Sequence, residues 1–96
     1  MKHAKAGDLL PVSGLLDRVR QIEGIRERTP GHFYFHGRNV LHFHTDNGSI
    51  YCDIGPERIK AEPEMFEEII SSLIELMKQI TQEKKKNQKV SEKKGK

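Results

Sequence analysis

Apolar and polar side chains alternate with a period of two in three short runs between residues 32 and 54, and glycine-containing turns separate these runs. A period of two places successive side chains on opposite faces of a β-strand. The runs cover residues 32–36, 40–44 and 49–54. They therefore predict three strands joined as an antiparallel meander, with Asn47-Gly48 as a tight hairpin turn.

Helical periodicity flanks the predicted strands on both sides. Apolar residues from Val12 to Ile22 recur in steps of three and four, which predicts a helix over residues 13–23. A wide apolar stripe after Pro63 predicts a second helix over residues 63–82. Residues 1–10 show no period, and we expect a loose lead-in there. Residues 57–62 are expected to form a connector, with room for a short edge strand over residues 58–60.

These elements define the expected fold class. It is α+β in two layers, with a helix, a three-stranded antiparallel β-meander and a long C-terminal helix. The length of 96 residues suits one domain, which we place at residues 1–82. Residues 83–96 hold seven lysines and two glutamates, a charge of +5 in a chain whose net charge is +3. We expect this tail to be disordered.

Charge, hydropathy and cysteine content limit the partners and the location. Because the tail carries the basic charge, residues 1–82 are slightly acidic, and we expect nucleic acid to bind only through the tail. No stretch approaches the ~20 apolar residues that span a bilayer, so no membrane association is expected. Cys52 is the single cysteine, which excludes an internal disulfide and favours the cytoplasm.

The register of the strands decides which side chains share a face. A two-residue loop at Asn47-Gly48 places His42 opposite Asp53. In the first hairpin, a three-residue loop over residues 37–39 keeps the apolar residues together and places His32 opposite His44. The core face then contains Phe33, Phe35, Leu41, Phe43, Ile50, Cys52 and Ile54. The opposite, open face contains His32, Tyr34, His36, Val40, His42, His44, Tyr51 and Asp53.

The open face admits three interpretations. His42, His44 and Asp53 could bind Zn²⁺ or another divalent metal, because His-x-His on a strand points both rings to one side and Asp53 supplies a carboxylate. Alternatively, Asp53 could orient His42 for acid–base catalysis without a metal. The face could also contact a protein partner or a second copy of the chain. We expect a binding module that uses the face formed by His32, Tyr34, His42, His44, Tyr51 and Asp53, with a small metal-dependent or His–Asp enzyme as the alternative.

The strand pattern also carries a resemblance. Pro30-Gly31-x-Phe33-Tyr34, then Leu41-His42-Phe43-His44, then an aspartate after a glycine-containing turn, resembles a group of small uncharacterised bacterial proteins. The similar region covers residues 30–54. The resemblance implies no activity or cofactor, and it implies only that His42, His44 and Asp53 belong to a shared pattern.

Overall fold

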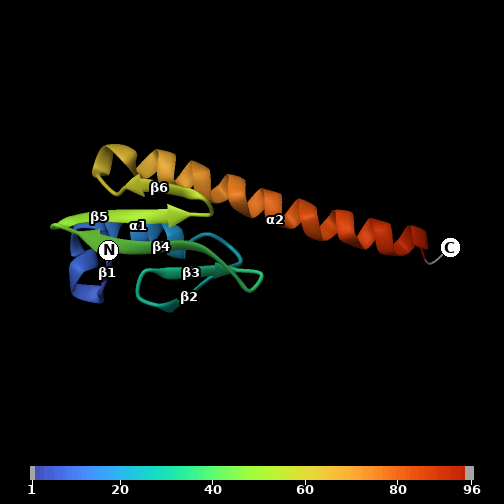
Figure 1. Cartoon of the computed structure of the whole chain (residues 1–96), viewed down its shortest axis with the longest axis horizontal. Coiled ribbons are helices and arrows are strands. Elements are labelled where there is room, and N and C mark those ends of the chain that lie inside the picture. Colours follow the sequence, from blue (N-terminus) through green and yellow to red (C-terminus); the bar gives the residue numbers. More distant parts are fainter. Residues whose placement is uncertain (1, 95–96) are drawn as a thin grey trace.

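The structure is a computed structural model that describes the backbone of residues 2–94 and the side chains of residues 4–84. Within these residues, five antiparallel strands lie in chain order, and a short sixth strand pairs with the middle one (Figure 1). The five are β2 (Ile25–Thr29), β3 (His32–Phe35), β4 (Arg38–Asp46), β5 (Ser49–Ile54) and β6 (Glu57–Lys60). The sixth, β1 (Lys2–His3), pairs with the end of β4.

The predicted three-stranded meander is therefore wrong in strand number. Strands β2 and β6 form the two edges of the sheet, and the option of an edge strand over residues 58–60 corresponds to β6. Both edge strands are polar, with Ile25 in β2 and Ile59 in β6 as their only apolar residues. Edge strands need only one apolar side and gain from charged side chains that discourage further pairing. A charged sequence of this kind shows no clear period of two.

The first hairpin has a tighter turn than the sequence predicts. Strand β3 ends at Phe35 and β4 begins at Arg38, so the loop is His36-Gly37. His36 and Gly37 have φ angles of 51° and 78°, which is the left-handed pair required by a type I′ hairpin turn. The predicted turn at Asn47-Gly48 is confirmed, with φ angles of 50° and 80°.

A β-bulge in β4 follows the tight turn and determines which face of the sheet the next residues occupy. Tyr34 pairs with Asn39 and Phe33 pairs with Leu41, so Val40 is an extra residue in β4. Val40 is 1% exposed, and its neighbour Leu41 is also buried. The expectation that Val40 lies on the open face is therefore wrong. The bulge also moves His32 from the predicted partner His44 to His42.

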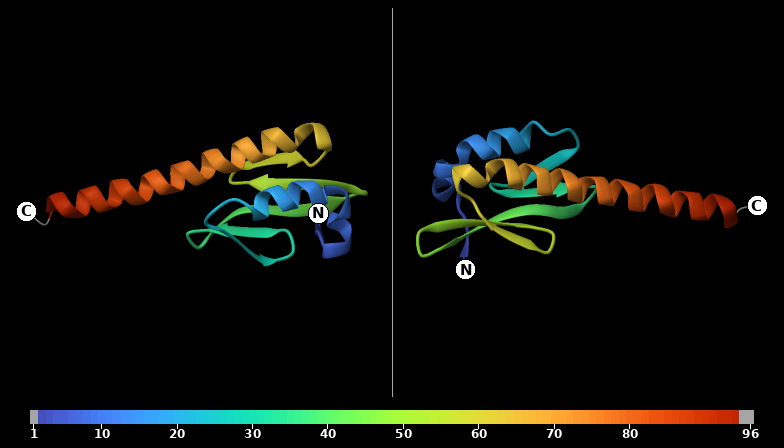
Figure 2. Two further views of the ribbon diagram at one scale, coloured as in Figure 1. Left: turned by 180° about the vertical axis from the view of Figure 1, so that it is seen from behind. Right: turned by 90° about the horizontal axis from the view of Figure 1, so that it is seen from above.

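Both helices cover one face of the sheet (Figure 2). Helix α1 (Ser13–Arg20) follows a 3₁₀ helix, η1 (Ala6–Val12), and α2 (Phe66–Lys94) follows a 3₁₀ turn, η2 (Pro63–Met65). The apolar side chains of α1 and α2 pack on the core face and bury Leu15, Val19, Ile69, Leu73, Phe33, Phe43 and Cys52, among others. The α+β class and the C-terminal helix agree with the sequence-based prediction.

The N-terminal region is more ordered than predicted. Instead of a loose lead-in, residues 2–12 contain β1 and η1, and the side chains of Ala4, Leu9 and Val12 are buried in the core. Helix α1 ends at Arg20, three residues before the predicted end at residue 23. Gly24 then adopts a φ of 90°, which is not helical.

Helix α2 runs along the sheet and continues past its end (Figure 1). Its side chains from residue 85 onwards lie outside the described part of the chain. The predicted disordered tail, residues 83–96, falls largely on those residues and stays a prediction, as does the domain boundary at residue 82. No helix in the described part of the chain combines the length and apolar character needed to cross a membrane.

An ion pair and a backbone hydrogen bond, both made by Glu27, link the edge strand β2 to helix α1 and to the turn before β3. Arg20 at the end of α1 donates from Nε to Glu27 Oε1 at 2.6 Å and from Nη2 to Glu27 Oε2 at 3.1 Å. The backbone N–H of Gly31 also donates to Glu27 Oε2, at 2.9 Å. These hydrogen bonds hold the pKa of Glu27 below its ordinary value. Glu27 therefore joins α1, β2 and the following turn.

Candidate metal centre

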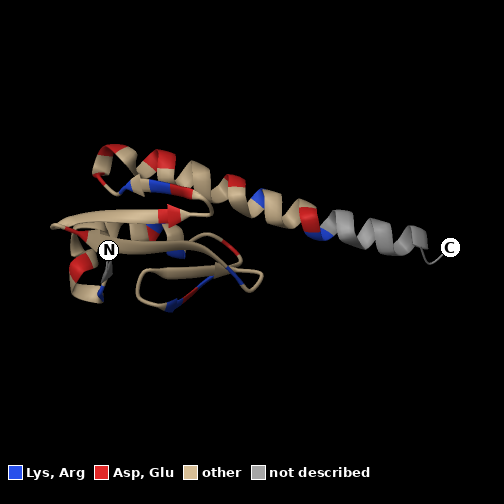
Figure 3. Ribbon diagram, in the orientation of Figure 1, with Lys and Arg blue, Asp and Glu red and all other residues tan. Residues whose placement is uncertain are grey.

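A row of polar side chains crosses the open face of the sheet. The registers place His32 opposite His42, His42 opposite Asp53, and Asp53 opposite Arg58, so the row joins β3, β4, β5 and β6. Directly opposed residues of an antiparallel pair have Cβ atoms ~4.5–5.5 Å apart. Figure 3 shows that the interior of the central strands is almost without charge, whereas β2 and β6 carry Lys and Arg. Strands β4 and β5 contain two acidic residues, Asp46 and Asp53. Asp46 lies at the hairpin turn, so Asp53 is the carboxylate in the interior of the central strands.

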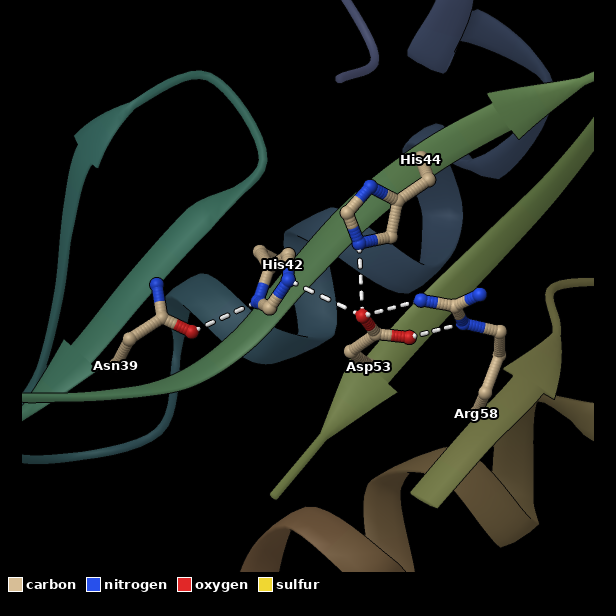
Figure 4. Close-up of polar contacts among 5 residues, drawn as sticks. All are labelled: Asn39, His42, His44, Asp53 and Arg58. Atoms are coloured by element: carbon tan, nitrogen blue, oxygen red, sulfur yellow. Dashed lines mark hydrogen bonds and ion pairs between the residues drawn. The ribbon is translucent and has the colours of Figure 1, made fainter. Parts of the chain in front are cut away.

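Two imidazole rings meet at one oxygen of this carboxylate (Figure 4). Asp53 Oδ2 lies 2.8 Å from His44 Nε2 and 3.2 Å from His42 Nε2. The three ligand atoms of His42, His44 and Asp53 all lie within 4.8 Å of one another. The edge of a Zn²⁺ coordination tetrahedron with bonds of ~2.0–2.1 Å is roughly 3.3 Å. The two separations to Asp53 Oδ2 are therefore already close to the edge length of such a tetrahedron.

The second nitrogen of His42 faces an oxygen as well. His42 Nδ1 lies 2.9 Å from Asn39 Oδ1, so Nδ1–H donates to the amide carbonyl. This hydrogen bond favours the tautomer whose Nε2 lone pair points toward Asp53. A lone pair and a carboxylate repel one another unless a cation lies between them, and that cation is a proton or a metal ion. A histidine that ligates a metal through one nitrogen commonly donates from the other in this way.

Arg58 completes the cluster from the edge strand β6. Its Nε donates to Asp53 Oδ1 at 2.7 Å, and its Nη2 donates to Asp53 Oδ2 at 3.1 Å. This two-point pairing is the strongest cause that lowers the pKa of Asp53 from 3.8 to about 2, and His44 adds to it. Asp53 is therefore ionised throughout the physiological pH range.

The cluster is sheltered but accessible. The side chains of His42, Asp53 and His44 are 28%, 15% and 11% exposed. A shallow depression of about 410 Å³ adjoins His42, and its lining also includes His32, Tyr34, Asn39 and Gly55. A small molecule can therefore reach the edge of the cluster from solvent.

The remaining predicted face residues lie around the cluster. His32 stacks on His42, with ring centroids 5.9 Å apart and planes 11° apart. Tyr34 lines the depression beneath Arg28, whose guanidinium lies 4.5 Å from the centre of the ring. Tyr51 lies opposite His44 on β5. His36 is exposed in the first turn, away from the group.

Two residues of the cluster, Asn39 and Arg58, were not predicted from the sequence. Asn39 was placed in the predicted loop, and only the bulge at Val40 brings it onto the open face beside His42. Arg58 belongs to an edge strand that the predicted meander lacked. The expected option of an edge strand over residues 58–60 pointed to it, and after the Gly55-Pro56 turn residues 57–60 do pair with β5.

Comparisons with known proteins leave the function open. The chain matches no protein-family model, no curated protein and no solved structure. Two imidazole nitrogens and one carboxylate oxygen form a ligand set typical of divalent transition metals. Cys52 takes no part, because it is buried in the core, and burial raises the pKa of its thiol to about 12.

Proposed function

We propose that the protein is a small binding module that holds one divalent metal ion on His42, His44 and Asp53. The observation that carries this proposal is the convergence of two Nε2 atoms and one carboxylate oxygen, with separations of 2.8 and 3.2 Å to the shared oxygen. Both histidines lie on the middle strand β4, and Asp53 lies on its paired neighbour β5. A rigid, hydrogen-bonded pair of central strands preorganises such a site.

The ligand set favours Zn²⁺ or a similar ion. Three protein ligands leave at least one coordination position for water or a ligand. The depression beside His42 provides access for that ligand. The hydrogen bond from His42 Nδ1 to Asn39 supplies the support from a neighbouring group that histidine ligands of metals require. We infer a cytoplasmic location from the single, unpaired cysteine, Cys52.

A His–Asp acid–base site without a metal is the second candidate. It is favoured by the 2.8 Å contact between His44 and Asp53, and by Arg58, which keeps Asp53 ionised. In that case a proton, rather than a metal ion, lies between each histidine and the carboxylate. Such a site could orient a histidine as a general base. Stoichiometric metal in the purified protein separates the two candidates.

The test is isothermal titration calorimetry of Zn²⁺ and Ni²⁺ into protein that has been freed of metal by a chelator. We expect one ion per chain, with binding lost at micromolar protein in His42→Ala, His44→Gln and Asp53→Asn. Asn39→Ala should weaken binding by about 10–100-fold, because Asn39 only orients a ligand. His36→Asn is the matched control, since it removes an exposed imidazole and suits the left-handed turn.

Two results would contradict the metal proposal. One is the absence of binding at micromolar protein, and the other is an equal small loss of affinity in every histidine variant. Circular dichroism of each variant checks that it folds, which matters most for the nearly buried His44. Either result would leave the open face as a contact surface for a protein partner or a second copy of the chain, or as an acid–base site.

A further inference from the structure

Arg58 already pairs with Asp53, whose carboxylate would have to ligate the metal ion. Its Nη2 lies 3.1 Å from Oδ2, the same oxygen that His42 and His44 approach, and its Nε lies 2.7 Å from Oδ1. A guanidinium is always charged in proteins and pairs well with planar anions through two parallel hydrogen bonds. Arg58 therefore competes with any cation that approaches Asp53 from solvent.

The charges of the cluster show what a cation would require. With neutral histidines, Asp53 and Arg58 cancel one another. A divalent ion adds two positive charges beside the guanidinium, and the interior of the central strands offers no second carboxylate to balance them. A divalent ion ligated by Asp53 and a guanidinium paired with the same carboxylate would repel one another strongly in this partly sheltered site. A bound anion would restore the balance and would give Arg58 a new partner.

We propose that the site takes a divalent cation together with a small oxyanion, and that Arg58 passes from Asp53 to the oxyanion. This inference rests on the proposed metal site. The guanidinium has the freedom to move, because the Arg58 side chain is 50% exposed and projects from an edge strand. The shared chemistry of the ligand is a planar or tetrahedral oxyanion, which both carboxylates and phosphates provide.

The surroundings of the cluster suit such a ligand. The depression beside His42 has room for more than a water molecule, and Tyr34, one of its lining residues, carries a hydroxyl that can donate a hydrogen bond. Lys60 lies on β6 two residues from Arg58, opposite Tyr51, and its ammonium is already paired with Glu62 at 3.0 Å. Arg26 shares that face on the other edge, because it lies opposite Tyr34. Arg26 and Arg28 of β2 would attract an anion to the face.

Calorimetry of Ni²⁺ binding tests this coupling. Metal-free protein is titrated in the presence and absence of millimolar inorganic phosphate, and separately of acetate, with sodium chloride at matched ionic strength. We expect the effective anion to raise the affinity for Ni²⁺ about tenfold, within the usual range for coupled sites. Free anion also chelates Ni²⁺, which lowers the apparent affinity, so an increase must come from the protein. The two anion arms distinguish a phosphate ligand from a carboxylate ligand.

Arg58→Gln provides the decisive variant. Without its competitor, the variant should bind Ni²⁺ alone at least as tightly as the wild type, and it should lose the gain from the anion. Arg38→Gln is the matched control, since Arg38 is an exposed arginine that pairs with Glu83 on α2. This control should keep the wild-type response to both anions.

The outcomes separate this inference from the metal proposal. Ni²⁺ binding without any gain from phosphate or acetate would overturn the coupling and leave the metal site intact. A gain that persists in Arg58→Gln would show that another group holds the anion, and would also overturn it. Failure of the wild type and of Arg58→Gln to bind Ni²⁺ under every condition would overturn both proposals.

Discussion

Replacement of Val40 by threonine tests the β-bulge that buries Val40 and brings Asn39 onto the open face. Threonine has nearly the shape of valine but replaces one methyl group by a hydroxyl. Val40 is 1% exposed, so the new hydroxyl would be buried among apolar neighbours. A buried hydroxyl without a partner costs ~1–3 kcal/mol. If Val40 lay on the open face instead, the change would lie within about 0.5 kcal/mol of zero.

The assay is equilibrium unfolding in urea. For a small domain the dependence of the unfolding free energy on urea is ~1–3 kcal/mol per M, so the midpoint should fall by roughly 1 M. Val19→Thr is the matched control, since Val19 is fully buried on α1 and should be destabilised in either register. A wild-type midpoint for Val40→Thr, together with a clear loss for Val19→Thr, would refute the bulge and restore the three-residue loop.

Three further changes probe the core, the first turn and the edge strand. Phe43→Ala should cost ~3–5 kcal/mol in urea unfolding, because the ring is fully buried on the middle strand; a loss below 1 kcal/mol would mean that Phe43 is not in the core. His36→Asn should melt at a higher temperature than His36→Val, since both lose the ring contact with Phe35 and asparagine tolerates the φ of 51° better than a β-branched residue, and the reverse order would contradict the type I′ turn. Glu27→Gln should cost about 1 kcal/mol at pH 7, because Glu27 joins Arg20 and Gly31. The pKa of Glu27 is lowered in the folded state, so this contribution is present above pH 4.5 and disappears as the pH falls below it; a difference between variant and wild type that does not change with pH would contradict this.

The second hairpin could be predicted from the sequence because its signals are local. Asn47-Gly48 determines a two-residue turn, and the alternation on either side determines the register from that turn. The predicted pair of His42 with Asp53 is confirmed. The proximity of the three candidate ligands follows from this pairing, whereas their role as ligands stays a proposal.

The first hairpin could not be predicted from the same reasoning. His36-Gly37 is not one of the Asn-Gly, Asp-Gly or Gly-Gly pairs that mark a type I′ turn, so the local sequence signal for this turn is weak. The bulge that buries Val40 beside Leu41 depends on how α1 and α2 fill the core. Because the turn was predicted one residue too long, His32 was placed opposite His44 instead of His42, and Asn39 was placed in the loop.

By itself, the sequence determined the α+β class, the C-terminal helix, the central hairpin and the neighbourhood of His42, His44 and Asp53. Periodicity and turn residues act over a few neighbouring positions, and these features need nothing more. Only the tertiary structure decided that the charged segment 25–29 becomes an edge strand and that the optional strand over residues 58–60 forms, since both pair through backbone hydrogen bonds that any side chain permits. The position of Arg58 on Asp53, and with it the competition at the candidate metal centre, follows from that pairing.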